Sequence, residues 1–282
     1  MIYNKISGFS DEIDANIDVQ FEVLNKLGIK YFEPRFINGK NISELCDEEV
    51  IALKEKMVAT EICASSIGSP IGKIKLTDDW KEHFNLFVRV CRSAKMLDCR
   101  YIRMFSFYHD GGEWTEDERA TVLKRLSEMI DYAKEQDLVL LHENEKDVYG
   151  DTSARCHDLM ESLYCDNFKA VFDPANFVQC GENVMDAYKK MQNFIAYMHI
   201  KDAKSDDGTV VPAGKGDGCI EYVLSELFAK NYDGFLSLEP HLGSFEGLSN
   251  LELDDKMLDL PKSGEGTFTL AYHSLLEIID RI

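Results

Sequence analysis

The sequence has few positive charges, no closely spaced cysteine pair and no long apolar segment. It contains 31 lysines and arginines against 51 aspartates and glutamates, giving a formal net charge of -20. Nucleic-acid binding depends on many lysine and arginine contacts with phosphates, so this balance predicts no nucleic-acid partner and favours a small substrate. No apolar run approaches the ~18 residues that span a bilayer, so we expect no membrane partner.

The eight cysteines are scattered and form no CxxC pair. This pattern is typical of reduced thiols, and not of a disulfide framework or a zinc site. The N-terminal residues MIYNKISGFSDEID lack a basic stretch followed by an apolar segment, so we expect no secretory signal. These features predict a folded protein of the cytoplasm.

Apolar, strand-like segments alternate with amphipathic, helix-like segments throughout the chain. Eight such pairs in 282 residues predict an α/β fold, a single-domain (β/α)8 TIM barrel over residues 1–282. A doubly wound sheet is the alternative, but no Gly-rich dinucleotide fingerprint follows the first strand. The expected strands are KISGFSD, IKYFEPRF, TEICASSI, CRYIRMFSFY, LVLLHENE, AVFDPANF, IAYMHIKD and GFLSLEP.

Helical spacing and capping residues mark the segments between these strands. Apolar residues recur at helical spacing from Ile17 to Leu27, and Thr115 and Glu118 form an expected capping box. The last segment, GTFTLAYHSLLEIIDRI, predicts a closing helix. Residues 242–266 are rich in Gly, Ser, Asp and Glu and are expected to form a loop insertion, either a lid or a solvated loop.

Four of the expected strands end on side chains that bind metals. These are Glu143, Asp173, His199 and Glu239. Residues two apart on a strand share one face, so all four can point inward together. Each also lies at the carboxyl end of its strand, where barrel enzymes assemble catalytic groups. Carboxylates at strand ends are often only caps or solvated residues, but an inward-facing set would be costly without a cation.

Three carboxylates and one imidazole can chelate one divalent cation. This donor set suits Mn(II), Mg(II), Co(II) or Zn(II), and the residue types alone do not choose among them. A chelated hydroxy-carbonyl substrate has a polarised carbonyl and an acidic neighbouring C–H group, so such a site favours enediolate chemistry.

The motifs GFSDEID, LGIKYFEPR, HENEK, FDPAN, HIKDA, PAGKGDG and LEPHL together resemble the xylose isomerase-like TIM barrels grouped as sugar phosphate isomerases/epimerases (AP endonuclease 2-type family). The resemblance covers nearly the whole chain. It implies that Glu143, Asp173, His199 and Glu239 bind the metal. It also implies that Glu143 and Glu239 are the catalytic residues that handle the proton.

The sequence also departs from parts of this family. Ketose 3-epimerases have a substrate-binding histidine three residues after the aspartate, where this chain has Asn176. They also have an arginine in the stretch that reads KDAKSDDGTVVPAGKG here, and this stretch has none. The endonuclease IV relatives need further histidines for a trinuclear zinc cluster, and these are absent, which together with the acidic charge argues against DNA repair.

Four more residues join Asn176 as candidate substrate contacts. Arg35 either recognises an anion or hydroxyl, or pairs with Glu33 to stabilise the barrel.

Lys201 either binds a substrate oxygen or forms a salt bridge with Glu143, Glu145 or Asp173. Glu145 orients a ligand or acts as a spare acid or base, or else pairs with Lys146 or Lys201. His241 faces inward by strand phase.

We therefore expect a divalent-metal-dependent isomerase or epimerase of a small sugar, sugar acid, cyclitol or sugar phosphate. A keto-polyol dehydratase of the inosose type shares the enediolate and is the alternative, and a non-catalytic sugar-binding barrel is the alternative of another class. The partner is a small polyol or sugar, with homo-oligomer formation left open. The turn containing Gly214, Gly216 and Gly218 is a weak candidate for binding phosphate.

Overall fold

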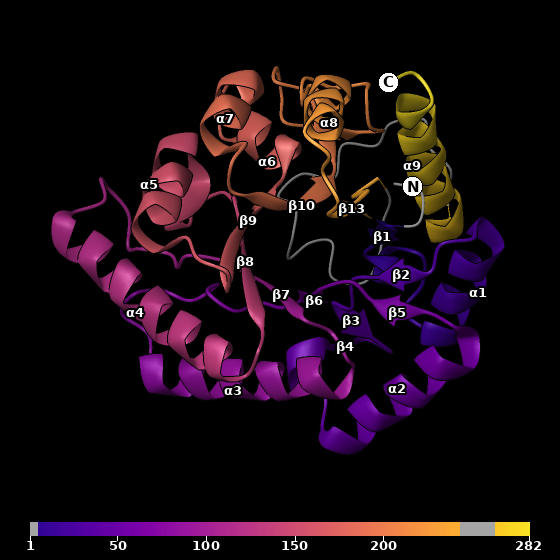
Figure 1. Cartoon of the computed structure of the whole chain (residues 1–282), viewed down its shortest axis with the longest axis horizontal. Helices are drawn as coiled ribbons and strands as arrows, with labels where there is room; N and C mark the ends of the chain where they lie inside the picture. The colour runs from indigo at the N-terminus through magenta and orange to yellow at the C-terminus, as the bar shows by residue number, and fades with distance from the viewer. Residues whose placement is uncertain (1–4, 243–262) are drawn as a thin grey trace.

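The structure is a computed structural model that describes residues 5–242 and 263–282. Helices lie around the outside of the strands (Figure 1). The strands are β1 (Ile6–Gly8), β2 (Tyr31–Phe32), β3 (Phe36–Ile37), β4 (Lys40–Asn41), β5 (Cys63–Ala64), β6 (Ile67–Gly68), β7 (Tyr101–Met104), β8 (Val139–Glu143), β9 (Phe168–Phe172), β10 (Ile195–Ile200), β11 (Asp202–Ala203), β12 (Val210–Val211) and β13 (Phe235–Leu238).

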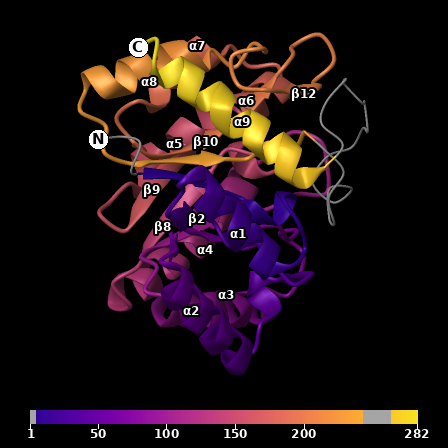
Figure 2. The same ribbon diagram turned by 90° about the vertical axis from the view of Figure 1, so that its right-hand side faces the viewer.

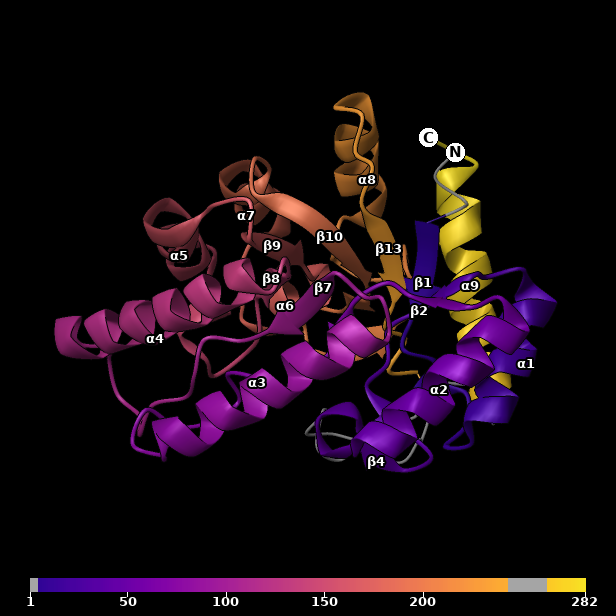
Figure 3. The ribbon, with the colours of Figure 1, turned by 60° about the horizontal axis from the view of Figure 1, so that its bottom comes forward.

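The helices follow these strands in the expected order. They are α1 (Ile17–Leu27), α2 (Asp47–Thr60), α3 (Trp80–Met96), α4 (Glu116–Glu135), α5 (Ser153–Leu163), α6 (Pro174–Gln179), α7 (Val184–Met191), α8 (Ile220–Ala229) and α9 (Gly264–Ile279), with short 3-10 turns η2 (Ser10–Glu12), η3 (Ile42–Glu44) and η4 (Tyr149–Asp151). Figure 3 shows α3, α4 and α5 on the outer side of β7, β8 and β9.

The barrel strands pair in parallel, whereas the short pairs β3–β4 and β11–β12 are antiparallel. Seven of them form one sheet in the order β1-β13-β10-β9-β8-β7-β6, and β2 pairs in parallel with β5. Backbone hydrogen bonds connect the two groups, because Glu33 N donates to Gly8 O at 2.8 Å and Gly68 N donates to Pro34 O at 2.9 Å. The predicted TIM barrel is therefore confirmed, with β5 and β6 together serving as its third strand.

Local sequence signals explain where individual helices begin and end. The Asn16 side chain accepts a hydrogen bond from Asp18 N at the start of α1, and Gly28 ends that helix in the left-handed region at φ 73°. The predicted capping box at α4 is confirmed, since the Thr115 and Glu118 side chains accept hydrogen bonds from each other's backbone N–H groups. These caps satisfy N–H groups that have no partner within the helix.

The closing helix α9 is also confirmed, and it packs against α8 and β13 (Figure 2). It begins at Gly264, inside the range expected to be a loop, because the Ser263 side chain caps it by accepting from Gly266 N. The remainder of that expected insertion, residues 243–262, lies outside the described residues.

Two apolar layers hold the barrel together. The larger packs helices against the outer faces of the strands and includes fully buried Phe21, Phe32 and Phe87. The smaller lies inside the barrel, where Val139, Leu141, Val171 and Tyr197 form a separate cluster. The smaller cluster contains the inward-facing neighbours of the site residues, so it forms the floor of the site. Within the described part of the chain, no helix is long and apolar enough to cross a membrane.

Candidate metal centre and active site

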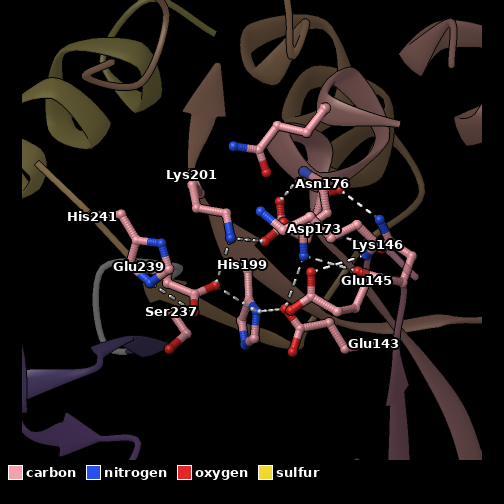
Figure 4. Close-up of polar contacts among 12 residues, drawn as sticks. Glu143, Glu145, Lys146, Asp173, Asn176, His199, Lys201, Ser237, Glu239 and His241 are labelled. Carbon is pink, nitrogen blue, oxygen red and sulfur yellow. Dashed lines mark hydrogen bonds and ion pairs between the residues drawn. The ribbon is translucent and has the colours of Figure 1, made fainter. Parts of the chain in front are cut away.

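The four strand-end residues converge at one end of the barrel. Glu143 is the last residue of β8, Asp173 directly follows β9, His199 lies in β10 and Glu239 directly follows β13. One ligand atom from each residue lies within 4.8 Å of those from the others, and all four side chains are buried. Their order around the sheet explains this, because β8, β9, β10 and β13 are consecutive neighbours. Figure 4 shows His199 between Glu143 and Glu239.

His199 is held by carboxylates at both ring nitrogens. Its Nδ1 lies 2.8 Å from Glu143 Oε1 and 3.3 Å from Glu239 Oε2, and its Nε2 lies 3.3 Å from Glu33 Oε2. Burial acts to lower the pKa of His199, but Glu143 and Glu33 raise it well above its usual value. Without a metal, a protonated imidazole therefore offsets part of the negative charge of these carboxylates.

Lys201 supplies a second positive charge to the group. Its Nζ lies 3.1 Å from Asp173 Oδ2 and 3.4 Å from Glu239 Oε2 (Figure 4). Burial raises the pKa of Asp173 to about 7, although Lys201 acts to lower it. At Glu239 burial also acts to raise the pKa, but Lys201 and His241 outweigh it and hold the pKa well below its usual value. Neighbouring cations therefore keep Glu239 ionised.

The residues present fit a bound divalent cation. Asp173 Oδ2 is fully buried and makes no hydrogen bond within the described residues, although Lys201 is its ion-pair partner. Buried carboxylate oxygens are ordinarily hydrogen-bonded or bound to a metal. Three carboxylates and one imidazole are a donor set common to Mn(II), Co(II) and Zn(II) sites. Glu143, Asp173, His199 and Glu239 would hold the ion.

Glu33 lies beneath this centre and is wholly buried. Its Oε2 accepts hydrogen bonds from Tyr197 OH at 2.9 Å and Ser237 Oγ at 2.8 Å, in addition to its contact with His199. The sequence interpretation placed Glu33 on the inward face but considered it only as a partner for Arg35. The alternation of side chains along its strand could have shown that Glu33 lies near His199. The contact itself depends on the closure of the barrel, in which Glu33 N of the β2 segment donates to Gly8 O of β1.

Arg35 belongs to a neighbouring cluster of buried charges. Its guanidinium contacts Asp11 at 2.9 Å, Glu12 at 3.2 Å and Glu239 at 3.3 Å. Because Glu239 is among its partners, Arg35 connects this cluster to the four candidate metal ligands. A role for Arg35 in substrate binding stays a prediction, since the side chain is buried with only 3% exposed.

His241 lies between the two clusters. Its Nε2 is 3.3 Å from Glu239 Oε1 and 3.5 Å from Glu12 Oε1, and its backbone N–H donates to Glu12 Oε2 at 2.7 Å. Burial acts to lower its pKa, but Glu12 and Glu239 raise the pKa to about 9, while burial raises the pKa of Glu12 to about 7. His241 also adopts φ 45°, a strained conformation for a residue with a side chain.

A small cavity of about 10 Å³ is lined in part by Glu143 and Glu239 of this four-residue group. Such a volume holds about one water molecule or one ion. The lining residues are Lys73, Arg103, Phe105, Glu143, Glu145, Lys146, Asn176, Gln179, Lys201, Glu239 and His241. Four of the five predicted substrate-binding residues are therefore at the cavity, and Arg35 is the exception.

Asn176 and Glu145 both line this cavity. Asn176 Nδ2 lies 3.5 Å from Glu143 Oε1, and its backbone N–H donates to Asp173 Oδ1 at 3.0 Å. Glu145 forms a 2.8 Å ion pair with Lys73, a partner that the sequence interpretation did not consider. Burial acts to raise the pKa of Glu145, but Lys73 and Lys201 lower it overall. Their contacts with a substrate stay a prediction.

The sequence interpretation also missed Arg103, which is buried in β7. Arg103 pairs in register with inward-facing Leu141, so strand alternation could have placed it inside the barrel. Its Nε lies 3.3 Å from Glu143 Oε2. Lys73 carried no comparable signal, because it lies in the turn after β6 and reaches the cavity only through the tertiary fold.

The Gly-rich turn binds a carboxylate of its own chain. The N–H groups of Gly214, Gly216 and Gly218 all donate to the Asp202 side chain, at 2.8, 3.0 and 2.8 Å. A Cβ atom on Gly216 would lie 2.4 Å from Asp202 Oδ1, so the close approach requires glycine. These glycines therefore shape the connection between β11 and α8. Their N–H groups are already hydrogen-bonded to Asp202.

Comparison with known proteins agrees with the resemblance stated above. The family model described as xylose isomerase-like TIM barrel matches residues 21–256, so the chain belongs to this family. Inosose dehydratase of Clostridium perfringens is 23% identical over 141 residues, which cover 44% of this chain and 48% of that protein. The match thus spans about half the length of this relative.

Two solved structures have the same fold over nearly their whole length. A crystal structure of the IOLI protein with a binding zinc atom has a TM-score of 0.77 at 18% identity, and covers 98% of both chains. The structure of L-ribulose 3-epimerase also has a TM-score of 0.77, at 17% identity, and covers 98% of this chain and 94% of that one. At these identities the similarity shows the fold alone.

Proposed function

We propose that this protein is a divalent-metal-dependent isomerase or epimerase of a small sugar or polyol derivative. The observation that carries the proposal is the pair Glu143 and Glu239, which line one cavity from β8 and β13 with His199 between them (Figure 4). Two carboxylates on opposite sides of a substrate can remove a proton from one face and return one from the other. The L-ribulose 3-epimerase and inosose dehydratase similarities support this reaction type.

The cation would be held by Glu143, Asp173, His199 and Glu239, and zinc in the IOLI protein structure supports a single transition-metal site. When bound, it would polarise the substrate carbonyl and favour negative charge on that oxygen. Manganese, magnesium, cobalt and zinc remain the candidate metals. Eight free cysteines fit an enzyme of the cytoplasm.

The protein's own residues would carry out the proton transfer. Glu239 is kept ionised by Lys201 and His241, so it can accept a proton from the carbon next to the carbonyl. Loss of that proton leaves an enediolate, whose negative charge Lys201 can approach from the cavity wall. Glu143, carrying a proton taken up from solvent, would then donate it either to the opposite face of the same carbon or to the neighbouring carbon. The first outcome is epimerisation and the second is isomerisation. In the second case the hydroxyl proton of the enediolate would move to the former carbonyl oxygen. Both carboxyl groups would then return to their starting states by exchanging protons with solvent.

Solvent deuterium uptake tests this function directly. The metal-loaded protein is incubated in D2O with a panel of keto-polyols and Mn(II), and loss of substrate C–H signals is followed by proton NMR. We expect Glu143→Gln and Glu239→Gln each to slow exchange by at least about 100-fold, since a positioned acid or base contributes roughly that much. The matched control is Glu55→Gln, which removes an exposed carboxylate from α2.

A non-catalytic sugar-binding barrel would bind ligands without any exchange. Exchange at the same rate in Glu143→Gln, Glu239→Gln and the parent protein would contradict the proposed roles. Metal content measured on the same samples shows whether a loss of exchange reflects chemistry or loss of the cation.

The second candidate is a keto-polyol dehydratase. The partial match to inosose dehydratase favours it, and the enediolate that Glu239 would generate can also expel a β-hydroxyl group. Glu145, on the cavity wall, is then a candidate to assist the departing hydroxyl. Ultraviolet absorbance of a conjugated enone or enol would identify dehydration, whereas epimerisation and isomerisation leave no such chromophore.

A further inference from the structure

The cavity wall is rich in positive charge, unlike the chain as a whole. Lys73, Arg103, Lys146 and Lys201 line the cavity, against the three carboxylates of Glu143, Glu145 and Glu239. In the whole chain, acidic residues outnumber lysines and arginines by 51 to 31. Two of the three lining carboxylates belong to the metal-binding group. Once those carboxylates bind a cation, the remaining wall carries a clear excess of positive charge.

Arg103 is the most distinctive member of this wall. Its side chain is only 6% exposed, and its Nε makes no hydrogen bond within the described residues. Its guanidinium lies 4.6 Å from the centre of the Phe105 ring and 5.3 Å from that of Phe9. Stacking on aromatic rings fixes the plane of a guanidinium, and a fixed planar fork suits the two oxygens of a carboxylate or phosphate.

Lys73 extends the positive wall beyond Arg103. Its ammonium group lies 4.4 Å from the centre of the same Phe105 ring and 2.8 Å from Glu145 Oε2. Phe105 therefore contacts both cations, and all three residues line the cavity. Lys73 is less buried than Arg103, with 22% of its side chain exposed, so it lies nearer the rim. A substrate extending from the metal towards the rim would meet Arg103 and then Lys73.

We propose that Arg103 and Lys73, with Lys146 on the lining of the same cavity, form an anion subsite, and that the substrate is a hydroxy-carbonyl compound bearing a carboxylate or a phosphate. This inference rests on the proposed function, because it places the anion on the substrate of the same metal centre. The Gly-rich turn does not serve as this subsite, since its N–H groups already bind Asp202.

Three small probes without stereocentres test the charge preference. They are dihydroxyacetone, hydroxypyruvate and dihydroxyacetone phosphate, which share the hydroxy-carbonyl unit. Hydroxypyruvate replaces one hydroxymethyl group by a carboxylate, and the phosphate ester adds a phosphate. Binding to the manganese-loaded protein is measured by titration calorimetry. We expect at least one charged probe to bind about tenfold or more tightly than dihydroxyacetone, and the tighter of the two distinguishes carboxylate from phosphate.

Variants separate the subsite from simple chelation of the anion by the metal. Arg103→Gln and Lys73→Gln should each reduce the preference for the charged probe by about tenfold while leaving dihydroxyacetone binding within twofold. Lys73 contacts none of the four metal-binding residues in the described structure, so its variant keeps the test valid if Arg103→Gln also weakens metal binding. Lys75→Gln is the matched control, because Lys75 is exposed and pairs with Asp110.

Two results would overturn the subsite. One is the absence of any charge preference in the parent protein, including no measurable binding of either charged probe. The other is a preference that persists unchanged in Lys73→Gln and Arg103→Gln, which would assign it to the metal alone. Failure of the proposed function is distinct, because it would appear as absent metal or absent deuterium exchange whatever the charge of the ligand.

Discussion

Glu33 Oε2 lies 3.3 Å from His199 Nε2, on the side of the ring opposite the other site carboxylates. Hydrogen bonds from Tyr197 and Ser237 hold this Glu33 oxygen in place. With Nε2 facing Glu33, Nδ1 is directed towards Glu143 and Glu239. A carboxylate that contacts the far nitrogen of a metal-binding histidine orients the ring and increases its basicity.

Replacing Glu33 should therefore weaken metal binding without removing a metal ligand. We expect Glu33→Gln to lower manganese or zinc affinity by about 10- to 100-fold, because partners of this kind typically contribute that much. Competition with a chromophoric chelator measures the change. Glu12→Gln is the matched control, since Glu12 is equally buried but contacts Arg35 and His241. Equal affinity in Glu33→Gln and the parent protein would exclude this role for Glu33.

Metal affinity should rise with pH. In the metal-free protein the pKa of Asp173 is raised to about 7 and that of His199 is raised well above its usual value, so both groups hold protons near neutral pH. Metal binding requires their deprotonated forms and releases these protons. We expect metal affinity to rise roughly tenfold per pH unit for each proton released. Release of the Asp173 proton contributes to this rise from pH 6 to about pH 7, and release of the His199 proton continues to contribute at higher pH.

Calorimetric titrations in buffers of different ionisation enthalpy count the released protons. A pH-independent affinity with no proton release would contradict protonation of these two groups. Asp173→Asn should abolish strong binding altogether, so the pH series is measured on the parent protein.

Lys201 should matter most to stability when no metal is bound. It is the ion-pair partner of Asp173 and also contacts Glu239, and both side chains are buried. Removing one member of a buried ion pair leaves an uncompensated charge and costs about 3 kcal/mol. We expect Lys201→Met to lower the unfolding free energy of the metal-free protein by about that amount.

Saturating metal should restore most of this loss, because the cation replaces the ammonium group as the counter-charge. Urea unfolding with and without Mn(II) measures both values. Lys215→Met, on the exposed turn, is the control. The same loss in both metal states would show that Lys201 stabilises the barrel independently of the metal-binding carboxylates.

His142 predicts a separate loss of stability in acid. It points away from the site, and burial lowers its pKa to about 3. Its pKa in the unfolded chain is about 6.5, so only the unfolded state gains a proton between these values. The contribution of His142 to the unfolding free energy should therefore fall with decreasing pH below about 6.5, by about 1.4 kcal/mol per pH unit.

The contribution of His142 is isolated by comparison with His142→Gln, which removes the titrating ring. In chemical unfolding at pH 7, 6, 5 and 4, the unfolding free energy of the parent protein minus that of the variant should decrease as the pH falls, by about 1.4 kcal/mol per pH unit below about pH 6.5. His157→Gln, which replaces a partly exposed histidine on α5, is the matched substitution. Parallel slopes for the parent and His142→Gln would contradict the burial of a neutral ring.

The barrel was predictable because its signals are local. Apolar runs identified the eight expected barrel strands, helical spacing identified α1, and Thr115 with Glu118 marked the start of α4 through contacts three residues apart. The convergence of Glu143, Asp173, His199 and Glu239 followed from strand phase and order, since parallel neighbouring strands present their carboxyl ends at one edge. Alternation along a strand is a short-range property, so it needs no tertiary information.

The partners of those residues depended on the closed barrel. Glu33 and Ser237 are separated by 204 residues, and Lys73 and Glu145 by 72, yet each pair is in direct contact. No sequence periodicity relates positions so far apart, because their contact depends on how strands close in space and how turns leave the barrel. Local patterns in the chain thus define the strands, the helices and the inward-facing metal-binding set. Tertiary closure alone decides which charges surround that set, and hence the substrate charge that the cavity favours.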